Sequence, residues 1–123
     1  MNLNSARVFV RDIAQAKQFY EQSLGLALKA DGTDHGYCVF DAGSALLVVE
    51  TVGSEAPEED QILVGRFTGL SFAVSDAHAK HKELTALGVE FTGEPEAQVW
   101  GGVIATLRDP AGNEFQIAQY PEA

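Results

Sequence analysis

The sequence carries one pattern twice, and this internal repeat constrains the fold more than any other feature. In each half, an alternating segment leads into an aspartate, a helical pattern and a glycine. The aspartates are Asp12 and Asp76, 64 positions apart, and the glycines are Gly25 and Gly88, 63 positions apart. Three further strand-like segments follow in each half. A unit of one helix and four strands is too small to close a core alone, so we expect the two units to form one domain.

The repeat places the expected elements within residues 1–52 and 66–120. In the first half we expect a strand at 5–11, a helix at 13–24 and strands at 26–30, 36–41 and 45–52. In the second half we expect a strand at 66–75, a helix at 77–87 and strands at 89–93, 98–109 and 113–120. Asp12 and Asp76 are the expected N-caps. The acidic segment 53–65 breaks the pattern and is predicted to be a solvated linker between the halves.

Composition narrows the range of partners. Eighteen acidic residues against eight basic ones give a formal charge of −10, and no basic cluster offsets it. Nucleic acids and anionic membranes are bound through Lys and Arg, so neither is expected as a partner. Hydrophobic residues make up 46% of the 123 residues, which is an ordinary globular balance. A small-molecule partner fits this composition best.

Other features indicate a cytoplasmic protein. No apolar stretch approaches the ~18–20 residues of a membrane span, and the N-terminus shows no signal-peptide pattern. The single cysteine, Cys38, has no partner for an internal disulfide. It lies in an apolar strand segment, where buried packing is its expected role.

Four motifs together resemble the vicinal oxygen chelate superfamily. They are Val10-x-Asp12, Phe19-Tyr20, Leu24-Gly25-Leu26 and Asp109-Pro110-x-Gly112-Asn113. This superfamily includes glyoxalase I, bleomycin and fosfomycin resistance proteins, and extradiol dioxygenases. The resemblance implies an α+β fold: two βαβββ modules forming a curled, mixed sheet with a groove and with the helices outside. It also implies a homodimer and a ligand held in the concave groove.

The same resemblance implies a divalent metal in the groove of the enzymes, so we compared the ligand positions. The first-strand positions, seven before each N-cap, hold Ser5 and Gly69, and the last-strand position of the second half holds Gln116. The corresponding position of the first half is Val48 or Glu50. A weak hydroxyl, an absent side chain and an amide do not make the usual set of His and carboxylate ligands. We therefore expect no metal ligands and no cofactor; a divalent metal held by Glu50 and Gln116, with a displaced His35, is the alternative.

Alternation along the strands predicts which residues face the groove. If Ser5 faces it, Arg7 and Phe9 do so too, while Val8 and Val10 pack under the helix. The residues predicted to bind ligand are Arg7, Phe9, Tyr37, Glu50, Ser71, Trp100 and Gln116. An inward Arg7 requires a partner, which is Glu50, Glu114 or an anionic ligand.

The sequence leaves two functional classes open. The first is a glyoxalase- or bleomycin-resistance-like protein that binds a small molecule without a metal. The second is a metal-dependent lyase, isomerase or dioxygenase with an atypical site, in which Glu50 or Glu114 abstracts a proton. Catalytic residues are not otherwise identified. His78 and His81 are expected on a solvated helix face, outside the chemistry.

Overall fold

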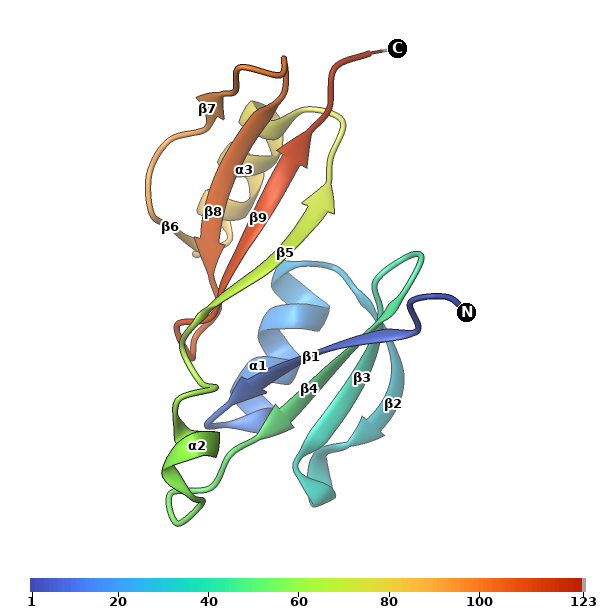
Figure 1. Cartoon of the computed structure of the whole chain (residues 1–123), viewed down its shortest axis with the longest axis vertical. Coiled ribbons are helices and arrows are strands. Elements are labelled where there is room, and N and C mark those ends of the chain that lie inside the picture. The colour runs from blue at the N-terminus through green and yellow to red at the C-terminus, as the bar shows by residue number, and fades with distance from the viewer. Residues whose placement is uncertain (123) are drawn as a thin grey trace. The chain divides into compact units, whose positions relative to one another are not determined.

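The computed structural model describes residues 1–122, which form two compact units (Figure 1). Unit 1 comprises Met1–Arg66 together with Pro110–Asn113, and unit 2 comprises Phe67–Asp109 and the segment that begins at Glu114. Each unit joins one helix to a mixed sheet, as the α+β prediction requires. None of the helices within residues 1–122 has the length and apolar character that crossing a membrane demands.

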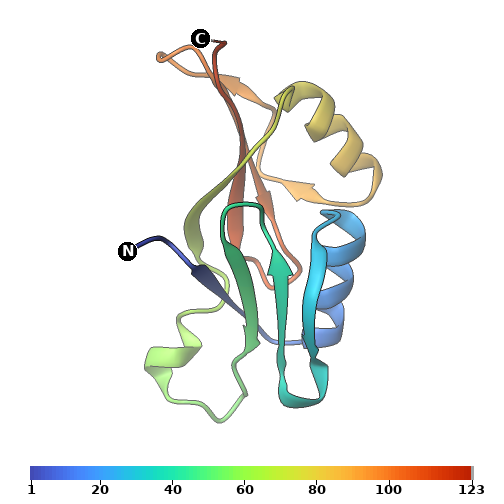
Figure 2. The same ribbon diagram turned by 90° about the vertical axis from the view of Figure 1, so that its right-hand side faces the viewer.

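Unit 1 follows the strand, helix and three-strand order of the repeat. Its elements are β1 Ser5–Val10, α1 Ile13–Gln18, a π-helical continuation Phe19–Ser23, β2 Ala27–Gly32, a 3-10 turn Thr33–His35, β3 Tyr37–Asp41, β4 Leu46–Thr51 and α2 Glu58–Gln61. The sheet order is β1-β4-β3-β2, with β1 parallel to β4 and the other pairs antiparallel. Helix α1 lies along one face of this sheet (Figure 2).

Unit 2 has the same plan with shorter outer strands. Its elements are β5 Phe67–Ala73, α3 Ala77–Ala86, β6 Glu90–Phe91, β7 Glu96–Ala97, β8 Val103–Arg108 and β9 Glu114–Gln119. The sheet order is β5-β9-β8-β6, and β7 pairs with β8 beyond β6. The parallel β5–β9 pair corresponds to the β1–β4 pair of unit 1.

Both helices begin and end as the repeat predicts. The Asp12 carboxylate accepts a hydrogen bond from the Gln15 amide at 3.1 Å, and Asp76 accepts one from Ala79 at 3.0 Å. These caps satisfy amides that have no partner within the helix. Gly25 follows the first helical segment with φ of 73°, the left-handed conformation in which glycine avoids a Cβ clash.

The helix-facing sides of the sheets form the cores, so the alternation prediction is confirmed. Val8 and Val10 are 1% exposed, whereas Arg7 between Val8 and Ala6 is exposed. In unit 1 the fully buried Tyr20 packs against Phe40, with ring centroids 5.7 Å apart. Cys38 is buried, as predicted. The remaining strand side chains therefore face away from the helix.

Three local predictions were wrong. The strand expected at 26–30 spans Ala27–Gly32, and the turn that follows is Thr33–His35, where the Asp31 carboxylate accepts hydrogen bonds from Thr33. Residues 98–109 are not one strand: Gln98 and Gly102 close a hairpin turn between β7 and β8. His81 is not solvated, because its side chain is 15% exposed and its ring packs at a tilt of 56° against that of Phe91, with centroids 4.4 Å apart.

The segment predicted as a linker is folded onto unit 1. Its acidic residues are exposed as expected, but Glu58–Gln61 forms helix α2, which composition did not predict. The Gln61 side chain donates to the carbonyl oxygens of Gly53 and Ala56, and Val64 bridges to Phe9. A few specific side-chain hydrogen bonds thus order a segment whose overall composition is that of a loop.

The turn between β8 and β9 belongs to unit 1 through Asn113. This side chain is 1% exposed, and its Oδ1 accepts from the Gly65 and Arg66 amides at 2.9 and 3.3 Å. Its Nδ2 donates to the Phe9 carbonyl oxygen at 2.7 Å. The Asp-Pro-x-Gly-Asn motif therefore shapes a turn and also anchors it to the first strand.

Candidate functional site

Unit 1 has a hollow on the sheet face opposite α1. It encloses about 440 Å³, within the usual range of ligand pockets. Its wall includes Arg7, His35, Tyr37, Val39, Val48 and Glu50. Three of the residues predicted from sequence to bind ligand, Arg7, Tyr37 and Glu50, thus lie together, and His35 joins them.

Arg7 and Glu50 form an ion pair at the edge of this hollow. The Arg7 Nε lies 3.1 Å from Glu50 Oε1, with the two side chains 64% and 30% exposed. In the β1–β4 register Glu50 stands beside Phe9, and Phe9 follows Arg7 by two residues on β1. Of the partners predicted for Arg7, unit 1 therefore supplies Glu50. An ion pair this exposed contributes no more than about 1 kcal/mol to stability.

Tyr37 provides a flat aromatic wall. It stands directly opposite Glu50 in the β3–β4 pair, and its ring lies over the backbone of Gly32 on β2. A Cβ at position 32 would overlap the ring, so the glycine is required for this arrangement. The residue remains 39% exposed. One face of the ring is thus fixed against the sheet.

His35 is held at the rim by a hydrogen-bonded turn. The 3-10 turn Thr33–His35 ends at Gly36, whose carbonyl oxygen accepts from the Thr51 amide at 2.8 Å and from its hydroxyl at 3.1 Å. Gly36 has φ of 79°, which fixes the direction of the chain beyond His35. The turn, and with it the rim, is therefore ordered before any ligand binds.

On the corresponding face of unit 2, the middle of the central strands carries uncharged polar residues. Gln116 is half-buried, and its Nε2 lies 3.4 Å from Thr106 Oγ1. Ser71 pairs with Gln116 across the parallel strands. A hollow of about 260 Å³ lies on this face, lined by Thr92, Glu94, Glu96, Gln98, Thr106 and Gln116.

Two other residues that the sequence singled out, Trp100 and Glu114, lie outside the hollow of unit 1. Trp100 lies in the β7–β8 turn, 45% exposed, with its ring 5.5 Å from that of Tyr120 and resting on Gly102. Glu114, a candidate base, accepts a hydrogen bond from Arg108 Nε at 2.9 Å. This hydrogen bond raises the pKa of Arg108. Arg108 also contacts Glu90, so it pairs with two acids.

The residues at the family's metal positions do not fit a metal ion. Within residues 1–122, no three His, Cys, Asp or Glu side chains are gathered closely enough to hold one. Gly69 has φ of 75° at an irregularity in the β5–β9 pairing, so a ligand side chain there would be strained. Register settles the open alignment: Ser71 and Arg7, each five before an N-cap, pair with Gln116 and Val48. The counterpart of Gln116 is therefore an apolar residue, and Glu50 belongs to no group of three potential ligands among the described residues.

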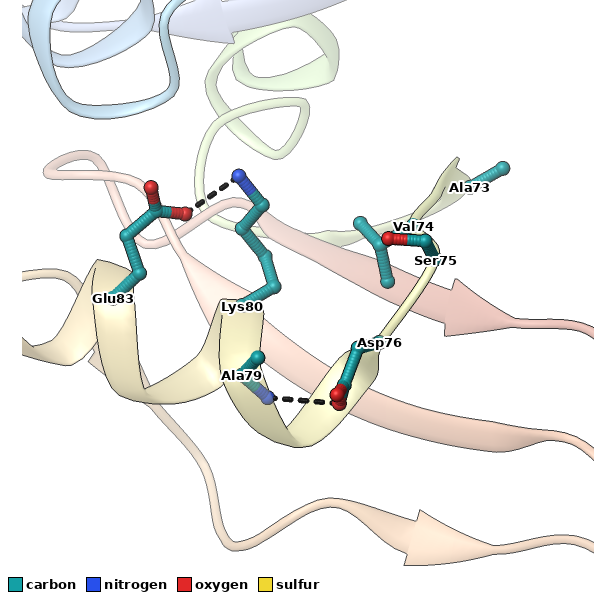
Figure 3. A pocket seen from close by; sticks show the side chains of 7 residues that line it. All are labelled: Ala73, Val74, Ser75, Asp76, Ala79, Lys80 and Glu83. Carbon is teal, nitrogen blue, oxygen red and sulfur yellow. Dashed lines mark hydrogen bonds and ion pairs between the residues drawn. The ribbon is translucent and has the colours of Figure 1, made fainter.

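A further hollow lies beside the start of α3, but its charged groups are already used. Figure 3 shows the Asp76 carboxylate turned to the Ala79 amide and Lys80 turned to Glu83. The cap satisfies the helix terminus, and the ion pair neutralises the one lysine in the lining. This surface offers a ligand less than the hollow of unit 1.

Sequence reasoning missed several residues of the two hollows. Val39 was within reach, because it follows Tyr37 by two positions on the same strand and so shares its face. Thr51 and Thr106 were not, because only strand pairing shows that they lie beside Gly36 and Gln116. Contacts within a strand can be predicted from periodicity, whereas contacts across strands require the register.

The architecture of two βαβββ units, each with an open sheet face, agrees with comparisons to known proteins. A sequence profile described as the glyoxalase/bleomycin resistance protein/dioxygenase superfamily matches residues 2–117. The chain belongs to this superfamily. It is 31% identical to the protein YraH of Bacillus subtilis (strain 168), over 95% of this chain and 97% of that one.

Two solved structures are similar over nearly the whole chain. A superfamily member from Sphaerobacter thermophilus DSM 20745 has a TM-score of 0.78 and 28% identity, with 97% of each chain covered. TnmS3, described as an antibiotic binding protein from Streptomyces sp. CB03234, has a TM-score of 0.77 and 26% identity, covering 98% of this chain and 97% of that chain. These similarities establish the family and the fold of this protein.

Proposed function

We propose that this protein binds a small organic molecule in the hollow of unit 1 and does so without a metal ion. The observation that carries the proposal is the joint placement of Arg7, Glu50 and Tyr37 around about 440 Å³ of open volume. A few convergent polar groups beside aromatic and aliphatic walls are the usual composition of a ligand pocket. The similarity to TnmS3, an antibiotic binding protein, supports binding as the activity.

The proposal that no metal ion is bound rests on the side chains available as metal ligands. Gly69 offers no side chain, the counterpart of Gln116 is the apolar Val48, and Glu50 belongs to no group of three potential ligands within residues 1–122. A catalytic metal site generally needs three protein ligands from His and carboxylate. Metal content of protein purified without chelator tests this directly. Stoichiometric metal that disappears in Glu50→Gln would establish the metal-dependent enzyme instead.

Binding itself is tested by thermal shift with a broad panel of small molecules. A ligand that binds only the folded protein raises its melting temperature by mass action. Val39 lies on the floor of the hollow, so Val39→Trp is expected to fill it and abolish the shift. Val99→Trp is the matched control, because Val99 is fully exposed and lies outside the hollow. A panel without any Val39-dependent hit would overturn the proposal.

We include a homodimer and a cytoplasmic location in the proposal. The family resemblance supports the dimer, and light scattering after gel filtration measures it. The location is supported by the single cysteine, Cys38, which is buried as a free thiol.

A further inference from the structure

The hollow of unit 1 presents two opposite charges and an aromatic ring on three adjacent strands. Arg7 stands on β1, Glu50 on the adjacent β4 and Tyr37 on the next strand, β3; Glu50 pairs with Tyr37, and Arg7 stands one row away. Neighbouring strands are about 4.8 Å apart, so the three strands span about 10 Å. One small molecule is long enough to touch all three side chains.

The ion pair is open to a ligand on both sides. Among residues 1–122, Glu50 is the only partner of the Arg7 guanidinium, and Arg7 is the only partner of the Glu50 carboxylate. A guanidinium has several N–H donors and a carboxylate several acceptor sites, so one contact saturates neither. A ligand can therefore bond to each group while the ion pair stays intact.

The charges of the protein discriminate among ligands. An anion at Arg7 would lie beside Glu50 and face a chain of formal charge −10. A cation at Glu50 would lie beside Arg7. A molecule that carries both charges on neighbouring atoms presents each to its opposite and has no net charge for the protein to repel. The 3.1 Å separation within the pair matches charges held on one small group.

The ring of Tyr37 adds a third requirement. Because the ring lies on Gly32, its position is fixed before a ligand arrives. A fixed aromatic surface favours a second flat ring, which stacks at little conformational cost. We infer that the hollow binds a small zwitterion that bears an aromatic ring, the pattern of a free aromatic amino acid. This inference rests on the proposed function and specifies the ligand class of the same site.

Titration calorimetry of the full chain tests the inference with four probes. L-Tryptophan has both charges and a ring, tryptamine lacks the carboxylate, indole-3-propionate lacks the ammonium, and L-alanine lacks the ring. We expect L-tryptophan to bind tightest. Loss of either charge should weaken binding about tenfold or more, the usual effect of one charge-assisted hydrogen bond. Equal affinity for tryptamine or indole-3-propionate would overturn the inference.

Variants assign each charge to its residue. Arg7→Gln should remove the preference for L-tryptophan over tryptamine, and Glu50→Gln the preference over indole-3-propionate. Lys29→Gln and Glu55→Gln are the matched controls, because both residues are exposed in unit 1 and lie outside the hollow. A preference that survives Arg7→Gln or Glu50→Gln also overturns the inference.

The failure of this inference is distinguishable from that of the proposed function. If neutral or singly charged compounds bind and Val39→Trp abolishes their binding, the hollow is a ligand site but its ligand is not a zwitterion. If no compound of the broad panel shows Val39-dependent binding, both proposals fail together. L-Tryptophan binding that Val39→Trp leaves unchanged would place the zwitterion elsewhere and overturn the inference.

Discussion

The two units share one plan but present different open faces. In unit 1 the row Phe9–Glu50–Tyr37 carries an acid between two aromatic residues, and the neighbouring row includes Arg7. The matching rows of unit 2, Ala73–Ala118–Ile104 and Ser71–Gln116–Thr106, carry no charge. Their buried faces, by contrast, remain apolar in both units. A duplicated fold can thus keep its core pattern while its open faces diverge: unit 2 carries its charge pair, Arg108 and Glu114, one row further along β8 and β9.

At equivalent positions of the two buried faces, the same two residue types stand on opposite strands. In unit 1, Phe40 on β3 pairs with Leu47 on β4; in unit 2, Leu107 on β8 pairs with Phe115 on β9. All four are at most 2% exposed. The total volume of the pair is kept while the aromatic ring moves to the other strand. Core packing thus constrains the sum of the two side chains more than the position of each.

The largest expected effect comes from core variants, which test whether the two cores are equivalent. Phe40→Ala and Phe115→Ala should each lower the free energy of unfolding by about 3–5 kcal/mol, because each leaves a cavity in a core. The double exchange Leu107→Phe with Phe115→Leu gives unit 2 the arrangement of unit 1 and should cost less than about 1.5 kcal/mol. Urea denaturation measures all three. An exchange as costly as the truncations would show that the two cores are not equivalent.

The next largest expected effect concerns the turn before the last strand, which the two units build differently. In unit 1 the Asp41 carboxylate accepts only a local bond from the Gly43 amide, whereas Asn113 bonds three backbone groups of unit 1. Asn113→Ala should lower the free energy of unfolding by about 2–4 kcal/mol, because three partly buried backbone groups lose a hydrogen-bond partner. The exposed Ser44→Ala should change it by less than about 0.5 kcal/mol. Similar losses from both variants would remove the distinction between the turns.

The first-strand positions give a smaller effect. Gly69→Ala forces an alanine into the left-handed region at φ of 75° and should cost about 1–2 kcal/mol. Ser5→Ala, at the matching position of β1, is expected to be near neutral, since Ser5 has ordinary strand geometry. Thermal unfolding of both variants checks this. A neutral Gly69→Ala would show that a side chain, including a metal ligand, is tolerated at position 69.

The smallest expected effect concerns one contact in each unit, between a basic side chain of the helix and an acidic side chain outside it. Lys17 and His81 occupy matching positions, five residues after each N-cap, and contact Asp31 at 3.3 Å and Glu94 at 3.9 Å. Hydrogen bonds from Thr33, and next from Lys17, lower the pKa of Asp31 from 3.8 to about 2. A lowered carboxyl pKa stabilises the fold above the unfolded value, and this contribution disappears as the pH falls from about 4 to about 2.

We therefore expect Asp31→Asn to reduce stability above pH 4 and to have a smaller effect near pH 2. Unfolding followed across this range measures the difference. Glu94→Gln is the comparison in unit 2, where the imidazole is charged only if protonated. An Asp31→Asn effect that is constant from pH 2 to pH 6 would contradict the pKa shift as its source.

The sequence-based predictions were correct where they depend on residues close together in the chain, and wrong where they depend on specific side-chain contacts or on another element. Asp12 caps a residue three positions away, and Val8 alternates with Arg7 along one strand, so both were predicted correctly. The end of the strand expected at 26–30 was misplaced because the turn after it depends on bonds between the Asp31 carboxylate and Thr33, which the strand pattern does not show. His81 was assigned to solvent because Phe91, which covers it, comes from another element.

The sequence by itself determined the repeat, the helix limits, the buried faces and the family, because each depends on neighbours a few residues apart or on motifs along the chain. The absence of metal ligands at Ser5, Gly69 and Gln116 stays a prediction, which rests on the family resemblance. Only the tertiary structure decided that Arg7 pairs with Glu50, that Tyr37 lies on Gly32 and that Val48 matches Gln116. These relations depend on strand register, in which a shift of one residue changes every cross-strand neighbour.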